Sequence, residues 1–317
     1  MNRANPLTLL LGVDHPVLLA PMAGVSGGAL ARAVSRAGGL GLIGGGYGDA
    51  GWLEEQLVMC AGERFGVGFI TWALHRQPRL LSRALDSGAQ AIMLSFGDIA
   101  PFAGPIRDAD AVLIAQVQTV AQARGAVAAG AQIIVAQGGE AGGHGGLRGT
   151  IALVPAVVDA VSPVPVIAAG GIADGRGLAA ALMLGAAGVL CGTAFYAAIE
   201  SIADPRAKQR VLEASGDDTV KSEVFDLVRA LDWPDGPWGL RSLRNGFSER
   251  WANDVSGLRS VLDEEQQRYG LSREQGDFDT AAVIAGEAVD LVHAIAPAAD
   301  ILLSLVDRCR EAFASAP

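Results

Sequence analysis

The chain has 317 residues, a formal net charge of -10 and a hydrophobic fraction of 50%. This size allows one large domain or a barrel with an appendage, and the apolar fraction is enough to bury a sizeable core. The negative charge disfavours a nucleic-acid partner, and no run of about eighteen apolar residues predicts a membrane span. The 3 cysteines are far apart and form no CxxC pair, which disfavours disulfides and a zinc site. We expect a cytoplasmic protein with no metal; the oligomeric state stays open, a homodimer included.

Short apolar runs followed by turn residues recur along the first two thirds of the chain. They predict eight strands, at residues 17–20, 40–43, 67–71, 91–95, 112–117, 133–137, 164–169 and 188–192. Helical patterns lie between them, at residues 28–37, 52–61, 78–87, 119–129, 153–161 and 175–184. Continuous apolar strands are typical of parallel sheets that are covered on both faces. The alternation predicts an α/β fold, a (β/α)8 TIM barrel, with an open doubly wound sheet as the alternative.

The character of the sequence changes after residue 200. Residues 200–276 are richer in charge, and Trp233, Trp238 and Trp251 lie among them. We predict a smaller, mostly helical insertion or lid domain at residues 201–279, with these tryptophans in its core. Residues 1–200 plus 280–317 are then the barrel, and the helical patterns at 281–295 and 298–312 are its last outer helices.

The most informative segment is a glycine-packed loop that follows the sixth predicted strand. It runs from Gln137 to Gly146 and presents a single histidine, His144. Glycines allow the backbone to approach a flat or phosphorylated ligand closely, and a histidine exchanges a proton near neutral pH. We therefore predict the chemistry here. Glu140, in the same loop, either orients His144 or holds the loop.

Two more glycine loops follow strands seven and eight, at residues 168–175 and 190–194. Loops at these places in (β/α)8 barrels often bind phosphate through backbone N–H groups and a helix N-terminus, and Thr193 adds a hydroxyl. Neither a GxGxxG dinucleotide fingerprint nor a GxxxxGK[ST] loop occurs, which favours a mononucleotide. Asp174 and Arg176 are expected to shape the start of the following helix, and Cys191 is interpreted as a small packing residue rather than a nucleophile.

Several of these motifs occur together in one known family. Residues 20–22 (APM), 95–97 (SFG), 137–144, 168–176 and 192–193 resemble the nitronate monooxygenase family, also called 2-nitropropane dioxygenases. The resemblance covers about residues 15–200 and continues weakly at 244–245 and 286–287. It implies an FMN-binding (β/α)8 barrel in which His144 is the catalytic histidine. The FMN-binding residues that it implies are Ala20, Pro21, Met22, Gly68, Gln137, Gly142, Gly143, Gly170, Gly171, Leu190, Cys191, Gly192 and Thr193.

Two positions depart from the family pattern. Gly68 stands where the family usually has an asparagine near the flavin, and Gly145 stands where an arginine commonly follows the histidine. Loss of an amide donor and of a positive charge is expected to weaken the hold on a small anion and to leave a roomier pocket. Flavin binding is expected to be less affected.

The resemblance implies an enzyme that uses FMN and O2 to oxidise alkyl nitronates or nitroalkanes, giving a carbonyl compound and nitrite. A related alternative is an FMN-dependent NAD(P)H reductase of quinones or enoyl thioesters. Two further alternatives remain. One is an isomerase or lyase whose glycine loops bind a substrate phosphate, and the other is a flavin- or ligand-binding protein without catalysis.

Overall fold

Eight parallel strands form the centre of the computed structural model, which describes residues 5–234, 236 and 238–315. The strands are β1 (Val17–Leu19), β2 (Leu42–Gly44), β3 (Gly66–Ile70), β4 (Ala91–Ser95), β5 (Val112–Val117), β6 (Ile133–Gln137), β8 (Val166–Ala169) and β9 (Gly188–Cys191). Their order is β1-β9-β8-β6-β5-β4-β3-β2, and a parallel bridge between Leu18 and Leu40 joins the two edges. The predicted barrel is confirmed, and the open-sheet alternative is wrong.

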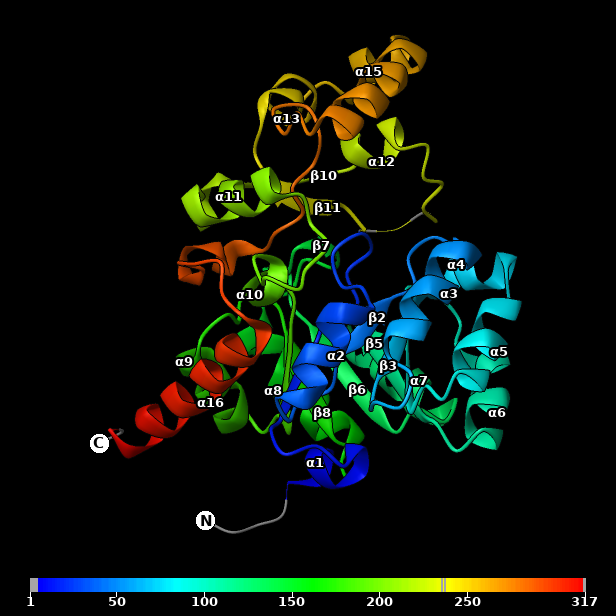
Figure 1. The fold of residues 1–317 in the computed structure, drawn as a ribbon, viewed down its shortest axis with the longest axis vertical. Coiled ribbons are helices and arrows are strands. Elements are labelled where there is room, and N and C mark those ends of the chain that lie inside the picture. Colours follow the sequence, from blue (N-terminus) through cyan, green and yellow to red (C-terminus); the bar gives the residue numbers. More distant parts are fainter. Residues whose placement is uncertain (1–4, 235, 237, 316–317) are drawn as a thin grey trace.

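Helices surround the barrel in alternation with the strands (Figure 1). They are α2 (Gly28–Arg36), α3 (Ala50–Met59), α4 (Thr71–Arg76), α5 (Arg79–Asp86), α6 (Ala100–Asp108), α7 (Val120–Ala128), α8 (Thr150–Val161), α9 (Gly175–Met183) and α16 (Ala298–Ala314). Each of the six helical patterns between the predicted strands coincides with one of them. Helices α4 and α6 were not predicted. α4 starts directly at the end of β3, and α6 contains Pro105; neither begins with a side chain that caps the helix.

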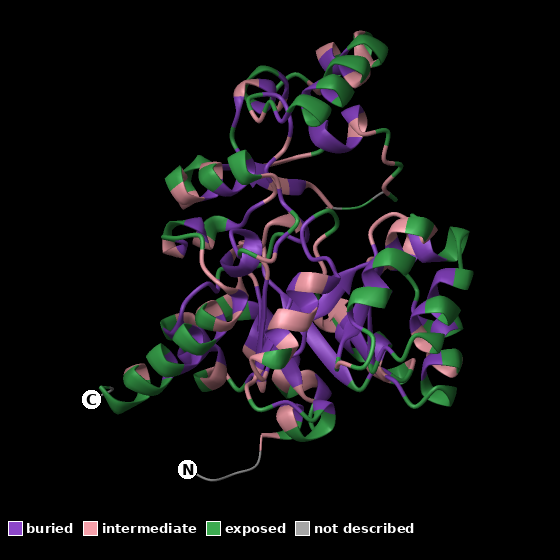
Figure 2. Cartoon of the chain, viewed as in Figure 1, coloured by how far each residue is buried: buried purple, intermediate pink, exposed green. Residues whose placement is uncertain are grey.

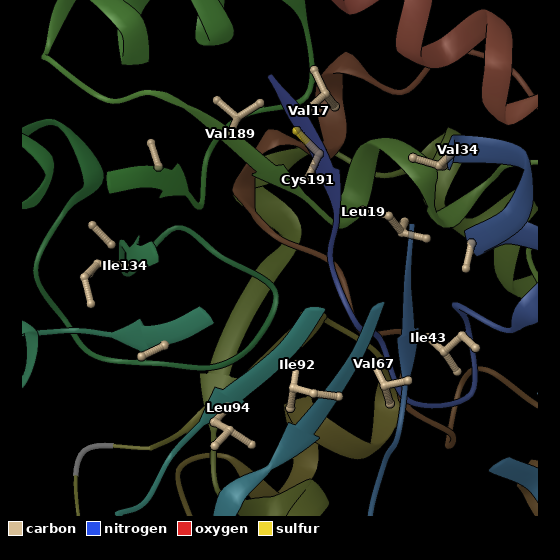
Figure 3. Close-up of a cluster of buried hydrophobic side chains, with 14 of the residues drawn as sticks. Val17, Leu19, Val34, Ile43, Val67, Ile92, Leu94, Ile134, Val189 and Cys191 are labelled. Atoms are coloured by element: carbon tan, nitrogen blue, oxygen red, sulfur yellow. The ribbon is translucent and has the colours of Figure 1, made fainter. Parts of the chain in front are cut away.

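Successive strand residues alternate between the barrel interior and the helix-facing layer. Leu18 lies in the interior cluster, together with Leu7 and Leu11 of α1 (Pro6–Leu11), whereas its neighbours Val17 and Leu19 pack against the helices. Figure 3 shows part of this outer layer. The strands are almost entirely buried, and the outer faces of the helices are exposed (Figure 2). This double burial explains the continuous apolar runs in the sequence.

A second group of elements follows α10 (Thr193–Tyr196) and lies beyond one end of the barrel (Figure 1). It contains α11 (Pro205–Glu213), η1 (Gly216–Asp218), β10 (Thr219–Ser222), α12 (Val224–Val228), β11 (Leu240–Leu243), α13 (Gly246–Trp251), α14 (Val255–Ser260) and α15 (Leu262–Gln275). The group is mostly helical, but it also has an unpredicted antiparallel sheet. That sheet has the order β10-β11-β7, and β7 (Gly143–His144) belongs to the glycine loop after β6.

The helix predicted at residues 281–295 is wrong. Residues 282–286 have no regular secondary structure, and only a short 3-10 helix, η2 (Glu287–Leu291), follows. Val283 and Ala285 are buried with a period of two, and the carbonyl oxygen of Val283 accepts a hydrogen bond from the Leu243 N–H. Tertiary hydrogen bonds thus override the helical propensity of this segment.

The last predicted helix is confirmed as α16, which packs against α9 and α2. Within the described ranges, no helix is both long enough and apolar enough to span a membrane.

Candidate active site

A cavity of about 350 Å³ lies at the carboxyl ends of the barrel strands, between them and the second group of elements. Its volume is within the range of small-molecule and cofactor sites. Every predicted site residue except Cys191 lines it, namely Ala20, Pro21, Met22, Gly68, Gln137, Gly142, Gly143, His144, Gly170, Gly171, Leu190, Gly192 and Thr193. The structure therefore brings together residues that the sequence places up to about 170 positions apart.

Cys191 is the exception because of the alternation along β9. Its side chain packs in the outer layer with Val17 and Val189, whereas Leu190 faces the cavity. Figure 3 shows this position. Burial raises the pKa of the Cys191 thiol to about 12, so the thiolate that a nucleophile needs is not formed near neutral pH. The interpretation as a packing residue is confirmed, and the side chain is not part of the candidate cofactor site.

The loops after β8 and β9 offer backbone donors to an anion. The N–H groups of Gly171, Gly192 and Thr193 form no hydrogen bond with any residue that the structure describes. Gly171 adopts a φ of 71°, a conformation that favours glycine. The Thr193 hydroxyl accepts a hydrogen bond from the Gly286 N–H at 2.9 Å and still has its own hydrogen to donate. These groups fit the phosphate of a mononucleotide.

The start of α9 does not take part in this anion site. The Asp174 carboxylate already accepts hydrogen bonds from the N–H groups of Arg176 and Gly177, at 3.0 and 3.2 Å. Asp174 therefore shapes the helix start as predicted, and a second anion at this helix N-terminus would meet its negative charge. The expected contribution of that N-terminus to phosphate binding is wrong for the loop after β8.

Gly68 does not leave the roomier pocket that its sequence suggests. A Cβ atom at this position would lie 2.2 Å from Cγ and 2.3 Å from Cβ of Pro21. The Pro21 ring thus occupies the space in which an asparagine side chain would begin. The expectation of a larger pocket at this point is wrong, because the Pro21 ring, which follows β1, takes the place of the missing side chain.

A glutamine network holds the base of the His144 loop. The side-chain oxygen Oε1 of Gln137 accepts hydrogen bonds from Gln116 Nε2 at 3.2 Å and from Gln118 Nε2 at 2.8 Å. Its Nε2 donates to the His144 main-chain oxygen at 3.0 Å. All three glutamines come from the ends of β5 and β6 or directly follow them, so the barrel itself sets the position of the loop.

Glu140 holds the loop and does not contact His144. Its carboxylate accepts hydrogen bonds from the Thr150 N–H at 2.9 and 3.0 Å and from the Thr150 hydroxyl at 2.9 Å. It thereby satisfies a free donor at the first residue of α8. Of the two roles that the sequence left open for Glu140, the structure shows the second.

Two cations from the second group of elements satisfy the carbonyl oxygens of the loop. Lys221 Nζ donates to the carbonyl oxygens of Gly145, at 2.7 Å, and Gly146. Arg241 donates to the Gly139 carbonyl oxygen at 3.1 and 3.2 Å and pairs with Glu287. The loop is therefore held both by the barrel strands and by the second group of elements. Lys221 also brings a positive charge close to Gly145, the glycine that stands in place of the family's arginine.

His144 is paired with a carboxylate that sequence reasoning missed. Its Nε2 lies 2.9 and 3.0 Å from the two carboxylate oxygens of Asp226, a residue of α12, and both side chains are buried. Burial lowers the pKa of His144 below its ordinary value of 6.5, and the hydrogen bond with Asp226 opposes this shift. His144 is thus neutral near pH 7. Because an ionised carboxylate only accepts hydrogen bonds, Nε2 carries the hydrogen and Nδ1 keeps its lone pair.

Aromatic rings cover the imidazole. Trp233 stacks on His144 with a centroid distance of 3.5 Å and an interplanar angle of 17°, and Phe96 meets His144 edge-on at 6.3 Å. Both rings line the cavity. Of the three tryptophans assigned to the insertion core, only Trp251 lies there, and Trp238 instead meets the ring of Phe96 at 5.3 Å. The core prediction is therefore wrong for Trp233 and for Trp238.

The sequence offers only a weak signal for these missed residues. Asp226 is separated from His144 by 82 positions, and no motif links the two. A single carboxylate inside the apolar run from Val224 to Val228 is nevertheless unusual, because a buried Asp needs a partner. That signal predicts a buried ion or hydrogen bond but not its partner.

Comparison with known proteins adds to this geometry. A sequence model of the nitronate monooxygenase family matches residues 4–61 and 73–308. The (3aS,4S,5R,7aS)-5-hydroxy-7a-methyl-1-oxo-octahydro-1H-indene-4-carboxyl-CoA dehydrogenase of Mycobacterium tuberculosis is 36% identical over 286 residues, which cover 85% of this chain and 80% of that protein. A probable nitronate monooxygenase of Staphylococcus haemolyticus is 34% identical over 270 residues, or 70% of this chain and 75% of the relative.

Two solved structures are similar to this protein over nearly its whole length. FabK from Thermotoga maritima has a TM-score of 0.87 at 30% sequence identity, and the match covers 99% of this chain and 98% of FabK. Nitroalkane oxidase from Streptomyces ansochromogenes has a TM-score of 0.81 at 27% identity, covering 97% and 99%. The chain therefore belongs to the nitronate monooxygenase family and is an oxidoreductase built on a (β/α)8 barrel.

Proposed function

We propose that this protein is an FMN-dependent enzyme that uses O2 to oxidise alkyl nitronates or nitroalkanes to a carbonyl compound and nitrite. The observation that carries this proposal is that His144, on the wall of the cavity, forms a buried pair with Asp226. The same cavity is lined by the loops that we propose bind phosphate. A nitroalkane is a carbon acid, and a neutral histidine is the base that such a substrate requires.

His144 acts as the base through Nδ1. Asp226 holds the Nε2–H, which fixes the tautomer and stabilises the positive charge that forms when the imidazole takes a proton. The lowered pKa keeps His144 unprotonated at neutral pH. Trp233 and Phe96 exclude water from the ring, so the proton comes from the substrate carbon and not from solvent.

The FMN site is formed by the barrel loops. The free N–H groups of Gly171, Gly192 and Thr193 would hold the phosphate, and the Pro21-Met22 backbone, which lines the same cavity, would contact the flat ring system. FMN, when bound, accepts the electrons of the substrate and passes them to oxygen. We further propose that residues 201–279 act as a lid, a role supported by Asp226 and Trp233, which reach the site from this part of the chain.

A second function also has specific support. FabK, whose fold matches that of this chain at 30% identity, and the CoA dehydrogenase of Mycobacterium tuberculosis indicate an enzyme that acts on thioester substrates. The aromatic wall of Phe96 and Trp233 suits an apolar acyl group at least as well as a small nitroalkane. We therefore keep an NAD(P)H-dependent reductase of enoyl thioesters or quinones as the alternative.

One anaerobic experiment separates the two functions. The FMN-loaded protein is mixed with excess NADH or NADPH in one cell and with propyl-2-nitronate in another, and the visible spectrum is recorded. Loss of flavin absorbance with the nitronate alone, followed by oxygen uptake on aeration, supports the oxidation of nitronates. Rapid and complete loss of absorbance with NADH or NADPH rejects this function in favour of the reductase. A protein that takes up no FMN contradicts both.

A further inference from the structure

Two buried hydrogen-bond donors in the cavity have no role in the site described so far. They are Arg229 Nη1, directly after α12, and Trp233 Nε1, and both residues line the cavity. Neither atom has a hydrogen-bond partner in the part of the chain that the structure describes. Buried donors without partners are rare in native proteins, because they lose the hydrogen bonds of water without a replacement. A ligand that brings acceptor oxygens into the cavity satisfies both.

Arg229 differs from two arginines that are held in ion pairs, and from Arg273, which also lines the cavity but is exposed. Arg241 pairs with Glu287 at 2.8 Å, and Arg76 pairs with Asp232 at 3.1 Å. Over the described ranges, no salt bridge involves Arg229. Its guanidinium thus places a positive charge without a direct ion pair on the wall of the cavity. This charge attracts an anion and lowers the pKa of His144, against the opposing effect of the Asp226 carboxylate.

The surroundings of the two donors place them next to the imidazole. Trp233 is stacked on His144, and the guanidinium carbon of Arg229 lies 5.5 Å from the ring centre of Tyr47, which also lines the cavity. Burial raises the pKa of Tyr47, so its hydroxyl stays protonated and is a third donor. The hydroxyl oxygen faces the Trp233 and Arg229 donors, which oppose that shift, but it is not a hydrogen-bond partner of Arg229 Nη1 or Trp233 Nε1. Trp72 supports the group from outside the cavity, with its ring centre 5.4 Å from that of Trp233.

We propose that Arg229, Trp233 and Tyr47 form a subsite for the oxyanion of the substrate, a planar group with two acceptor oxygens such as a nitronate or a carboxylate. A guanidinium matches the two oxygens of such a group with two parallel N–H donors. The subsite supplies from the second group of elements the positive charge that Gly145 does not provide. It deepens the proposed function, on which it rests for the identity of the reacting group.

The test uses the FMN-loaded protein and an anion that is not turned over. The probe is 2-methylpropanoate, which has the shape of propyl-2-nitronate, and the neutral comparison is 2-methylpropanamide. Binding is followed by the change in flavin absorbance, which tryptophan substitutions do not affect directly. We expect the wild type to bind the carboxylate more tightly than the amide. Arg229→Gln should weaken carboxylate binding about tenfold or more and leave amide binding unchanged.

Matched controls come from the outer side of the same aromatic group. Arg76 lies 4.9 Å from the ring centre of Trp72 but does not line the cavity, so Arg76→Gln should bind the carboxylate like the wild type. Trp233→Phe should weaken binding severalfold, whereas Trp72→Phe should not. If Arg229→Gln loses flavin, Arg229→Lys takes its place, because it keeps the charge and removes only the two-pronged geometry; its carboxylate affinity should then lie below that of the wild type.

Two results overturn the subsite: a wild type that does not distinguish the carboxylate from the amide, or an Arg229 variant that retains flavin and binds the carboxylate as tightly as the wild type. Failure of the proposed function looks different. A protein that binds the carboxylate through Arg229 but does not oxidise the nitronate rejects that function and keeps the subsite. A protein that oxidises the nitronate with an unchanged KM in Arg229→Gln keeps the function and rejects the subsite.

Discussion

Replacing Asp226 by asparagine tests the pairing on which the proposed chemistry depends. The carboxylate lies 2.9 Å from His144 Nε2, and the two side chains are 9% and 6% exposed, so solvent screens their interaction little. A hydrogen bond to a charged group contributes about 1.5–3 kcal/mol. This stabilisation is largest when the imidazole takes up the substrate proton. At 1.36 kcal/mol for each factor of ten, we expect kcat to fall about 10- to 150-fold.

The same substitution should also shift the pH dependence of kcat in a definite direction. Burial lowers the pKa of His144 and the Asp226 hydrogen bond raises it, so removal of the carboxylate should lower that pKa further. The acid limb of the kcat profile, where activity is lost as the base becomes protonated, should therefore move to lower pH. Asparagine retains the size of aspartate, so the cavity should keep its shape.

The assay compares two substrates of the same enzyme. Only the neutral nitroalkane needs a base, whereas the matching nitronate has already lost its α-proton. Oxygen uptake is measured with each substrate between about pH 5 and 8, the range in which histidine ordinarily titrates. We expect Asp226→Asn to slow the nitroalkane reaction and to leave the nitronate reaction much less affected. Asp232→Asn is the matched control, because that carboxylate lies nearby in sequence but is 84% exposed.

Two outcomes refute the reasoning. One is a decrease in kcat for the nitroalkane of less than about tenfold, since the hydrogen bond would then contribute less than the lower limit of its usual range. The other is an acid limb that moves to higher pH in Asp226→Asn, because the carboxylate would then not be raising the pKa of His144.

Three further predictions follow from the structure. Gly68→Ala places a methyl group against the Pro21 ring, so it should destabilise the protein by about 1–3 kcal/mol in thermal unfolding. An unchanged melting temperature would show that the turn at Pro21 moves aside freely. Gly171→Ala forces an alanine into a left-handed conformation, so FMN affinity should fall about tenfold in a fluorescence titration; equal affinity means that this loop does not hold the phosphate. The lowered pKa of His144 contributes stability that is present above pH 6.5 and is lost as the pH falls toward the folded-state value. His144→Gln should therefore show a smaller loss of urea stability over this window, and an identical loss would contradict the burial argument.

Much of the candidate site could be predicted because it is local to the strand ends. Gln137, Gly171 and Thr193 each follow an apolar strand directly, and the closed parallel sheet brings all carboxyl ends to one mouth. The prediction of side-chain direction was less complete. Cys191 belongs to a matching motif, but the two-residue period of β9 turns its side chain toward the helices.

The sequence by itself determined the barrel, the glycine loops and the place of His144, because short-range periodicity and turn residues encode strands, helices and the order in which they alternate. Only the tertiary structure decided what surrounds the histidine. Asp226, Arg229 and Trp233 come from a part of the chain more than eighty residues away. Because β11 pairs with β7, Asp226 reaches His144, and Arg229 and Trp233 reach the cavity. A contact across such a distance depends on how two separately folded elements pack, which no local pattern of residues records.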